Sequence, residues 1–405
     1  MGGRKAILES LRVTTNEHPA SGIQHPVFSK LTIPARVNVL GNPSDANEGA
    51  HATISAAIDT YAGATVEPAG ALVLEAVTRE NEDGGERLAR QSFDGPPPYP
   101  YDGTLDLLKG AVNRMHAYSP QFRRRLAERG GVRIATWTGV PRQSGLGGSS
   151  LLVLLALAGL RAFYELDPRI HNDYVLAELA QRVEAQELGI TCGYADRYVP
   201  LFGGLAYLDY RGKLHQRAIG EEPFVTYERL DPWVPDLPLV IAFTGVVRDS
   251  GDVHAVMRAR YLKEYAEYEH GGPKPFMLEV MERVGATAWR GKMALLGGDW
   301  AEFGRLMVEN HRLVDEMMAY CGLPGGAGVA NNALIQAALA AGALGAKLTG
   351  AGGGGSVFAL ARPGHEEELV EALRAAADGA GLKNARVWRA HVDRDGLRQT
   401  MSNEQ

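Results

Sequence analysis

Glycine is the residue that most constrains how this chain can fold. It occupies 49 of the 405 positions, which is well above the usual share of about 7%. The glycines follow no triplet repeat, so a collagen-like helix is excluded. Glycine is unfavourable inside helices and strands. An excess in a globular chain therefore predicts loops in which the backbone turns sharply or comes close to a ligand.

The rest of the composition predicts a large folded core. Hydrophobic residues make up 45% of the chain and charged residues 22%, a balance that excludes disorder and coiled coil. The length corresponds to two or three domains at about 150 residues per domain. Charged and proline-containing loops between 212 and 236 suggest a boundary there. We expect an N-terminal domain over 1–225 and a C-terminal domain over 226–405.

Charge and cysteine content narrow the partners and the compartment. The net charge is −6, so no global basic field attracts nucleic acid or an anionic membrane. Two cysteines, Cys192 and Cys321, are too few for a disulfide framework and fit a reducing cytosol. The longest apolar run, 151–160, is about half of a membrane span. We expect a soluble cytoplasmic protein, monomer or homodimer.

Hydrophobic periodicity predicts a mixture of strands and helices that is typical of an α+β fold. The predicted strands are 33–40, 53–66, 71–78, 132–138, 205–210, 237–244, 346–348, 356–361 and 385–390. A charged hairpin region follows the third of them, up to position 90. The predicted helices are 105–117, 149–165, 173–188, 253–269, 274–296, 300–321, 331–341 and 366–377.

The first glycine-rich loop lies between a strand and a long apolar helix. It runs from Pro141 to Ser150 and holds Gly145, Gly147 and Gly148. A helix N-terminus after such a loop offers N–H groups and a positive dipole end to a phosphate. The loop lacks the G-K-[ST] ending of a Walker loop and the spacing of a dinucleotide fingerprint. A flexible loop followed by a helix that Ser149 or Ser150 caps is the alternative.

A second glycine-rich loop, 348–356, lies between two strands and has five glycines in six residues, Gly350 and Gly352 to Gly355. So many glycines exceed what a hairpin turn needs. They leave a bare backbone that can pack against another loop or line a phosphate cradle. A floppy linker is the alternative.

Two carboxylates are candidates for metal binding and proton abstraction. Glu184 shares a helical face with Leu176 and Ala180, and a carboxylate there is costly unless it is paired or metal-bound. Asp196 follows twelve residues later, after the loop that contains Gly193. Both could instead be solvated residues near helix ends.

Two further segments carry polar residues. A strand runs into the turn Gly41-Asn42-Pro43-Ser44-Asp45, in which Asp45 could be only an Asx-turn residue. The segment from Arg248 to Arg258 holds His254 four residues before Arg258. It forms either a cationic edge or the capped start of a charged helix. No histidine or cysteine spacing fits a zinc site.

Taken in order, the segments 34–45, 141–150 and 347–356 resemble the three motifs of the GHMP kinases. The likeness covers about Leu31 to Ala390. It implies a two-domain fold, with a ribosomal-S5-domain-2-like N-terminal half and a ferredoxin-like C-terminal half. It also implies ATP and Mg²⁺ as cofactors.

The resemblance also implies roles for individual residues. Asp196 would face the acceptor hydroxyl with Arg36 beside it, and Glu184 with Ser150 would hold Mg²⁺. The ATP phosphates would lie against Pro141, Gly145, Leu146, Gly147, Gly148, Ser149, Ser150, Gly352 and Gly353. The acceptor would lie against Asn42, Asp45, Gly193, Arg197 and Gly350.

Details of these motifs point to an anionic sugar. Asn42-Pro43 stands where galactokinases have Glu-His, and the segments 187–190, 196–197 and 249–260 look like glucuronokinases. Those enzymes phosphorylate the anomeric hydroxyl of D-glucuronate. A uronate carboxylate needs a cation, for which the candidates are Arg142, Arg197, Arg248, His254 and Arg258. Another GHMP acceptor, or a sugar sensor without turnover, are the alternatives. A dinucleotide-dependent oxidoreductase is a remote third, because the fingerprint is missing.

Overall fold

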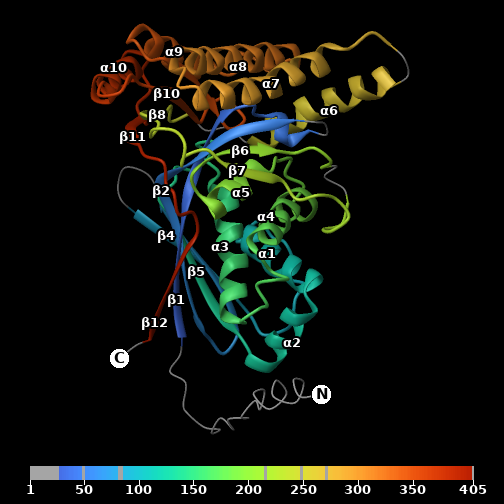
Figure 1. Cartoon of the computed structure of the whole chain (residues 1–405). Helices are drawn as coiled ribbons and strands as arrows, with labels where there is room; N and C mark the ends of the chain where they lie inside the picture. The colour runs from blue at the N-terminus through green and yellow to red at the C-terminus, as the bar shows by residue number, and fades with distance from the viewer. Residues whose placement is uncertain are drawn as a thin grey trace, which may run out of the picture.

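The computed structural model describes residues 27–47, 51–80, 85–213, 217–246, 250–269 and 272–403. Two sheets, each with its own helices, make up the molecule, one above the other in Figure 1. The α+β class and the two-domain arrangement predicted from the sequence are confirmed.

The larger sheet has eight strands. The order β12-β1-β2-β5-β3-β4 forms its main path, and β6 pairs with the far end of β2 and with β7. The strands are β1 (Val27–Leu40), β2 (Ala52–Pro68), β3 (Leu72–Glu80), β4 (Gly85–Phe93), β5 (Val132–Thr138), β6 (Leu205–Asp209), β7 (Thr226–Arg229) and β12 (Arg398–Asn403). β3 and β4 form the charged hairpin predicted after the third strand.

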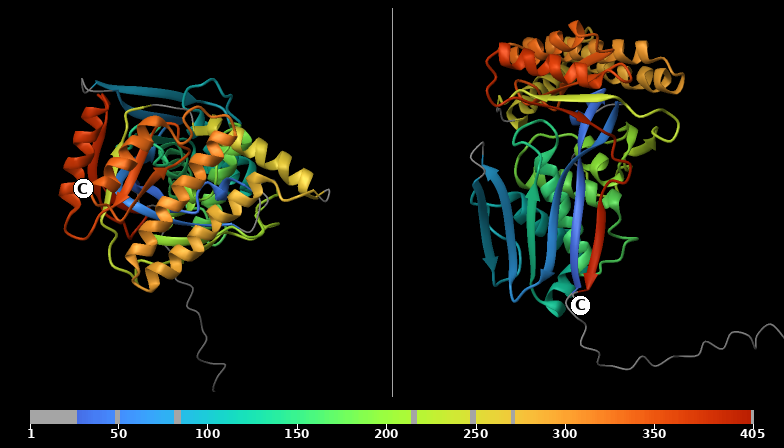
Figure 2. Two further views of the ribbon diagram at one scale, coloured as in Figure 1. Left: turned by 90° about the horizontal axis from the view of Figure 1, so that it is seen from above. Right: turned by 90° about the vertical axis from the view of Figure 1, so that its left-hand side faces the viewer.

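Helices cover one face of this sheet, as the two side views show (Figures 1 and 2). They are α1 (Asp106–Tyr118), α2 (Pro120–Arg129), α3 (Gly148–Phe163), α4 (Asp173–Arg182), the π-helical turn η2 (Val183–Glu187) and α5 (Ala195–Phe202). α3 packs on β1, β2 and β5 and is buried along most of its length, from Val153 to Leu160. Its apolar sequence makes it the central helix, because almost every side of it can be removed from water.

The smaller sheet is antiparallel, in the order β11-β8-β10-β9. Its strands are β8 (Leu239–Phe243), β9 (Gly345–Thr349), β10 (Ser356–Leu360) and β11 (Arg386–Ala390). The helices of this half are α6 (Ser250–Glu269), α7 (Phe276–Leu296), α8 (Trp300–Tyr320), α9 (Val329–Ala340) and α10 (Glu366–Gly379). α7 and α8 lie on β1, and α7 also contacts β2 and the 3₁₀ turn η1 (Ser44–Ala46). The two halves therefore meet around the end of β1.

Strand pairing gives a reason to place the domain boundary after the predicted division at 225/226. β7 pairs with β6, and β12 returns from the C-terminus to pair with β1, so both complete the first sheet. We propose that the second domain begins after β7, near 230–238. The sequence prediction also missed α2 and α5, and it merged α4 and η2 into one helix. Short edge strands and short helices bury few residues, so their periodicity is weak.

Candidate active site

Arg36 of β1 and Asp196 of α5 meet although 160 residues separate them. The Arg36 Nε–H donates to Asp196 Oδ1 over 2.6 Å, and Nη1 donates to the Gly145 carbonyl over 2.5 Å. The Arg36 side chain is 3% exposed and that of Asp196 is 22% exposed. A buried guanidinium thus joins a partly exposed carboxylate to the glycine loop.

The loop before α3 presents the start of that helix toward this pair. Gly147 is the N-cap with φ of 86°, and among the described residues no side chain caps this end. The alternative reading, a helix capped by Ser149 or Ser150, differs from the structure: both serines lie in the first turn and bond to Glu184. The first N–H groups of a helix have no acceptor within the helix, and a helix start without a side-chain cap suits an anion.

Both serines donate to Glu184. Ser149 Oγ is 2.7 Å from Oε1 and Ser150 Oγ is 3.0 Å from Oε2. The carboxylate is 1% exposed and also forms an ion pair with Arg197. The sequence predicted that a carboxylate on this face needs partners, and the structure supplies three. Glu184 sits in the π-helical turn η2, a distortion that is frequent at functional sites.

Arg197 lies between the two carboxylates. Its Nη2 contacts Glu184 Oε2, its Nη1 donates to the Gly193 carbonyl over 2.7 Å, and the same Nη1 is 3.7 Å from Asp196 Oδ2. The side chain is 1% exposed. Burial, and then the nearby charge of Arg36, lower the pKa of Arg197 to about 9. The structure thus gives the guanidinium partners within the protein, and the role of Arg197 toward an acceptor carboxylate stays a prediction.

Asp45 of η1 approaches the start of α5. Its Oδ2 accepts the Ala195 N–H over 3.0 Å, and a Cβ built on Gly193 would lie 2.1 Å from that oxygen. Burial, and then the charge of Asp196, raise the pKa of Asp45 above its usual value. Cys192 lies nearby, and burial followed by the charges of Asp196 and Asp45 raises the pKa of its thiol.

The second glycine loop packs on the first, as the bare backbone suggested. A Cβ on Gly350 would lie 2.7 Å from Gly145 Cα, and one on Gly145 would lie 2.7 Å from the Thr349 carbonyl oxygen. Both glycines have positive φ, so conformation and space together require glycine. The sequence argument against a hairpin was wrong, because β9 and β10 pair antiparallel across this loop.

Gly352 and Gly353 lie on the other side of the same loop. Gly352 faces Met318 of α8, and the Gly353 N–H donates to the Ala327 carbonyl over 2.7 Å. That amide has a partner within the protein in this structure, and the contact of Gly352 and Gly353 with phosphates stays a prediction. Gly350 and Gly355 are the glycines of this loop placed against the first glycine-rich loop, at Gly145 and at Ser144.

Three side chains from the C-terminal half hold the end of β1, and the sequence prediction gave none of them a role. Lys347 Nζ donates to the Asn38 carbonyl, Asn42 Oδ1 and the Leu348 carbonyl, over 3.1, 2.8 and 2.7 Å. Asn310 accepts the Gly41 N–H over 2.9 Å, and Thr349 Oγ1 accepts the Asn38 N–H over 3.1 Å. Burial, and then the charge of Arg36, lower the pKa of Lys347 well below its usual value.

The sequence contained signals that could have identified Lys347 and Asn310 as buried polar residues. Lys347 is a single cation inside an apolar strand, and Asn310 stands on the buried face of α8. Asn42 is 1% exposed and receives Lys347 at its oxygen, so it is fixed from the C-terminal half.

α6 carries His254 and Arg258, two of the cations considered for an acceptor carboxylate, toward Asp45 and Asp196. Arg258 Nη1 donates to the Ala46 carbonyl over 2.9 Å, directly after Asp45. One turn earlier, His254 is close enough to Asp196, Arg197 and Arg36 to be affected by their charges. Burial is the main cause that lowers its pKa to about 4; the charge of Asp196 acts in the opposite direction, and the charges of Arg197 and Arg36 lower the pKa further. Arg142 is exposed, and Arg248 lies outside the described residues.

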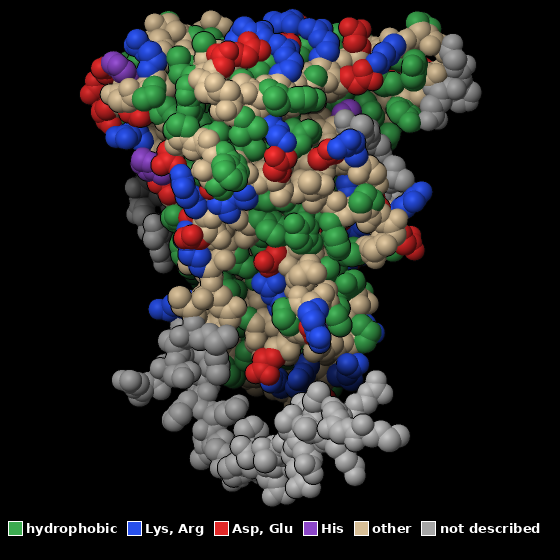
Figure 3. Space-filling view, viewed as in Figure 1, with side chains coloured by type: hydrophobic (Ala, Val, Ile, Leu, Met, Phe, Trp, Pro, Cys, Tyr) green, Lys and Arg blue, Asp and Glu red, His purple; other side chains and the backbone are tan. Residues whose placement is uncertain are grey.

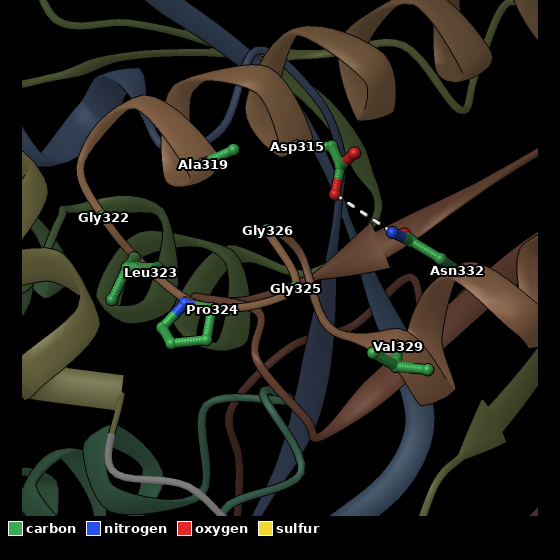
Figure 4. A pocket seen from close by; sticks show the side chains of 9 residues that line it. All are labelled: Asp315, Ala319, Gly322, Leu323, Pro324, Gly325, Gly326, Val329 and Asn332. Atoms are coloured by element: carbon green, nitrogen blue, oxygen red, sulfur yellow. Dashed lines mark hydrogen bonds between the residues drawn. The ribbon is translucent and has the colours of Figure 1, made fainter.

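A separate cavity of about 690 Å³ lies between the end of α8 and the start of α9 (Figure 4). Its walls include Asp315 and Asn332, whose side chains are hydrogen-bonded over 3.1 Å, and the apolar Leu323, Pro324 and Val329. The carboxylates Asp45, Glu184 and Asp196 are not in its lining. On the face shown in Figure 3, basic and acidic side chains are interspersed. In the part of the chain that the structure describes, no helix has the length and apolarity that crossing a membrane requires.

The donor set at Glu184 fits a magnesium ion that is shared with phosphates. Mg²⁺ in phosphoryl-transfer sites takes one or two protein oxygens together with phosphate oxygens. Glu184 and the Ser149 and Ser150 hydroxyls are such oxygens, next to an uncapped helix start. Among the described residues, no cluster of three or more His, Cys, Asp or Glu side chains could hold a metal ion by itself. A cation that also binds phosphate oxygens does not require such a cluster.

An uncapped helix start, a buried serine–glutamate group and an arginine-held aspartate are groups of the kind that phosphoryl transfer requires. Family models agree: residues 106–204 match the GHMP kinases N terminal domain and residues 292–379 match the GHMP kinases C terminal domain. The chain belongs to the GHMP kinase family, whose members use ATP as the phosphoryl donor.

Individual relatives cover most of the chain. It is 31% identical to a probable glucuronokinase 2 of Arabidopsis thaliana, over 89% of this chain and 92% of that protein. It is 26% identical to a D-glycero-alpha-D-manno-heptose 7-phosphate kinase of Campylobacter jejuni, over 84% of this chain and 91% of that one. The solved structure of Lactococcus lactis galactokinase complexed with galactose superposes with a TM-score of 0.68 at 18% identity, covering 93% of this chain and 95% of that one.

Proposed function

We propose that the protein transfers the γ-phosphoryl group of ATP to the anomeric hydroxyl of an anionic sugar, with D-glucuronate as the first candidate. The observation that carries the proposal is Asp196, held by Arg36 and flanked by Arg197, beside the serine–glutamate group at the start of α3. In this arrangement the partly exposed carboxylate of Asp196 can accept a hydrogen bond from the acceptor hydroxyl, and the start of α3 beside it can bind the ATP phosphates.

In the proposed mechanism, Asp196 accepts the hydrogen bond of the attacking hydroxyl and takes or orients its proton. Arg36 fixes the direction of that carboxylate through Nε and ties it to the Gly145 carbonyl. The first-turn N–H groups of α3 hold the phosphates. Glu184 and Ser150 would hold Mg²⁺, which neutralises phosphate charge when bound. Phosphoryl transfer depends mainly on such positioning and electrostatics.

The charges around Asp196 are compatible with an anionic acceptor. Two almost completely buried guanidiniums, those of Arg36 and Arg197, balance two of the three carboxylates there. The third, Asp45, has its pKa raised by burial, which favours its neutral form. His254, whose pKa is about 4, is neutral at pH 7 and can donate a hydrogen bond to an acceptor carboxylate. We propose His254 of α6 for that contact, with Arg258 one turn further along. His254 is preferred to Arg197 for this contact because Arg197 already bonds Glu184 and Gly193 within the protein.

Two of the relatives, named as glucuronokinase and heptose 7-phosphate kinase, act on sugars that carry a negative charge. Glucuronate is preferred because the glucuronokinase relative has the higher identity, 31% against 26%. A heptose 7-phosphate is the second candidate.

An acceptor panel tests the proposal. Purified protein with Mg·ATP is offered D-glucuronate, D-galacturonate, D-galactose, a heptose 7-phosphate and mevalonate, and ADP release is followed. We expect the highest kcat/KM with D-glucuronate, and phosphorus NMR should show an anomeric phosphate. A higher value with the heptose phosphate or galactose would contradict the substrate assignment. ADP release with none of them would indicate a sugar sensor.

The variant His254→Ala tests the proposed contact between His254 and the acceptor carboxylate. If His254 holds the acceptor carboxylate, this variant raises KM for glucuronate at least tenfold and leaves the weak reaction with galactose unchanged. Equal losses with both acceptors would contradict the assignment of His254.

A further inference from the structure

We propose that Arg197 is an internal counter-ion that competes with a divalent cation for Glu184, and that cation binding lets Arg197 close on Asp196. Arg197 is then a positioning residue that couples the metal site to the acceptor site. The inference rests on the proposed metal role of Glu184.

The contacts place one guanidinium between both groups. Nη2 contacts Glu184 Oε2, the same oxygen that Ser150 bonds, while Nη1 stands 3.7 Å from Asp196 Oδ2. The Arg197 Nε–H is buried and has no hydrogen-bond partner among the described residues. The guanidinium therefore pairs closely with Glu184, while its Nε–H lacks a partner and its Nη1 is too far from Asp196 for a hydrogen bond.

A cation at Glu184 would change this balance. Arg197 and the cation carry like charges at one carboxylate, and their repulsion is strong at a buried site. The next carboxylate along the guanidinium is Asp196. A shift of less than about 1 Å would bring Nη1 from 3.7 Å to ordinary hydrogen-bond distance. Asp196 would then be held by two arginines, with its orientation toward the acceptor fixed.

The alternative is that the Arg197–Glu184 pair is a permanent ion pair with a purely structural role. In that case removal of Arg197 would leave Glu184 buried without its cation and would weaken folding, but it would not improve cation binding. The two readings therefore predict opposite changes in metal affinity.

Mn²⁺ binding measured by electron paramagnetic resonance, with a non-hydrolysable ATP analogue present, separates them without any turnover. We expect Arg197→Gln to bind Mn²⁺ at least tenfold more tightly than the wild type, because the competing charge is gone. Arg197→Lys, which keeps the charge, should stay within about threefold of the wild type. Unchanged or weaker binding by folded R197Q would overturn the proposal. A wild-type protein that binds no Mn²⁺ beyond the free nucleotide would instead contradict the metal role of Glu184.

A second experiment tests the coupling between cation binding and acceptor binding. By calorimetry, wild-type protein should bind D-glucuronate more tightly when Mg²⁺ and the ATP analogue are both present than with the analogue alone. R197Q should lose this cation-dependent gain, and a retained gain would contradict the coupling. If R197Q does not fold, the ¹⁵N signal of Arg197 in the wild type, assigned by its loss in R197K, must shift when Mg²⁺ is added. Absence of that shift would overturn the proposal.

Discussion

Replacing Gly193 by alanine should disconnect Asp45 from the acceptor site. The new Cβ would lie 2.1 Å from Asp45 Oδ2 and 2.4 Å from Cγ, whereas ordinary contacts begin near 3.4 Å. The φ angle of Gly193 is outside the left-handed region, so the backbone itself accepts alanine. The strain falls on the carboxylate, which must move by more than 1 Å.

The size of the effect follows from what that movement breaks. Overpacking a tight site costs about 1–3 kcal/mol, and a charge-assisted hydrogen bond such as that from Ala195 N–H to Asp45 contributes about 1.5–3 kcal/mol. We expect the free energy of unfolding to fall by about 2–4 kcal/mol. A displacement of about 1 Å in a positioning group can lower the rate about a hundredfold, so KM for the acceptor should rise at least tenfold. Nucleotide affinity should change by less than about twofold, because α3 and Glu184 stay in place.

Urea unfolding and steady-state kinetics with glucuronate measure both effects. Gly70→Ala is the matched control, because among the described residues nothing lies within 4 Å of its Cβ position. A folded G193A protein with wild-type KM for the acceptor would refute the proposed contribution of Asp45.

Three further predictions concern Asp196, Asp45 and Lys347. Asp196→Asn should lower kcat about a hundredfold or more while nucleotide affinity, measured by calorimetry, is retained; near-normal turnover would contradict its role. Asp45→Asn should raise the free energy of unfolding above that of the wild type at high pH. The folded pKa of Asp45 is raised by burial, so the stability that its protonated form contributes is present below the unfolded pKa and lost as pH rises through the folded pKa. Urea unfolding at pH 4 and pH 8 should show a gain for D45N only at the higher pH, and an equal gain at both would count against this reasoning. Lys347→Met leaves three oxygens without their donor and should lower the free energy of unfolding by about 1–3 kcal/mol, whereas an unchanged urea midpoint would show that the bonds contribute little.

Local patterns in the sequence carried the fold class and most of the elements. The apolar run after Ser150 predicted α3, and segments with a β-like pattern of residues predicted β2 and β5, because helix and strand preferences are local properties of the sequence. The two glycine loops were located for the same reason: glycine marks backbone conformations that other residues avoid. The buried position of Glu184 followed from its spacing to Leu176 and Ala180.

Other features depended on residues far apart in the chain. β12 is an edge strand whose partner, β1, begins near the other end of the chain, so its own sequence does not specify it. Arg197 was expected to bind an acceptor carboxylate, because nothing local indicates that Glu184, thirteen residues earlier, is its partner.

By itself, then, the sequence determined which segments bend, which are buried and which carry the acid, base and cation candidates. The tertiary structure decided their partners. It placed Arg36 against Asp196, Lys347 against Asn42 and Gly193 against Asp45. Each of these contacts spans more than a hundred residues. Such contacts form only when the two sheets and their helices have packed, because burial and close approach, not local conformation, select them.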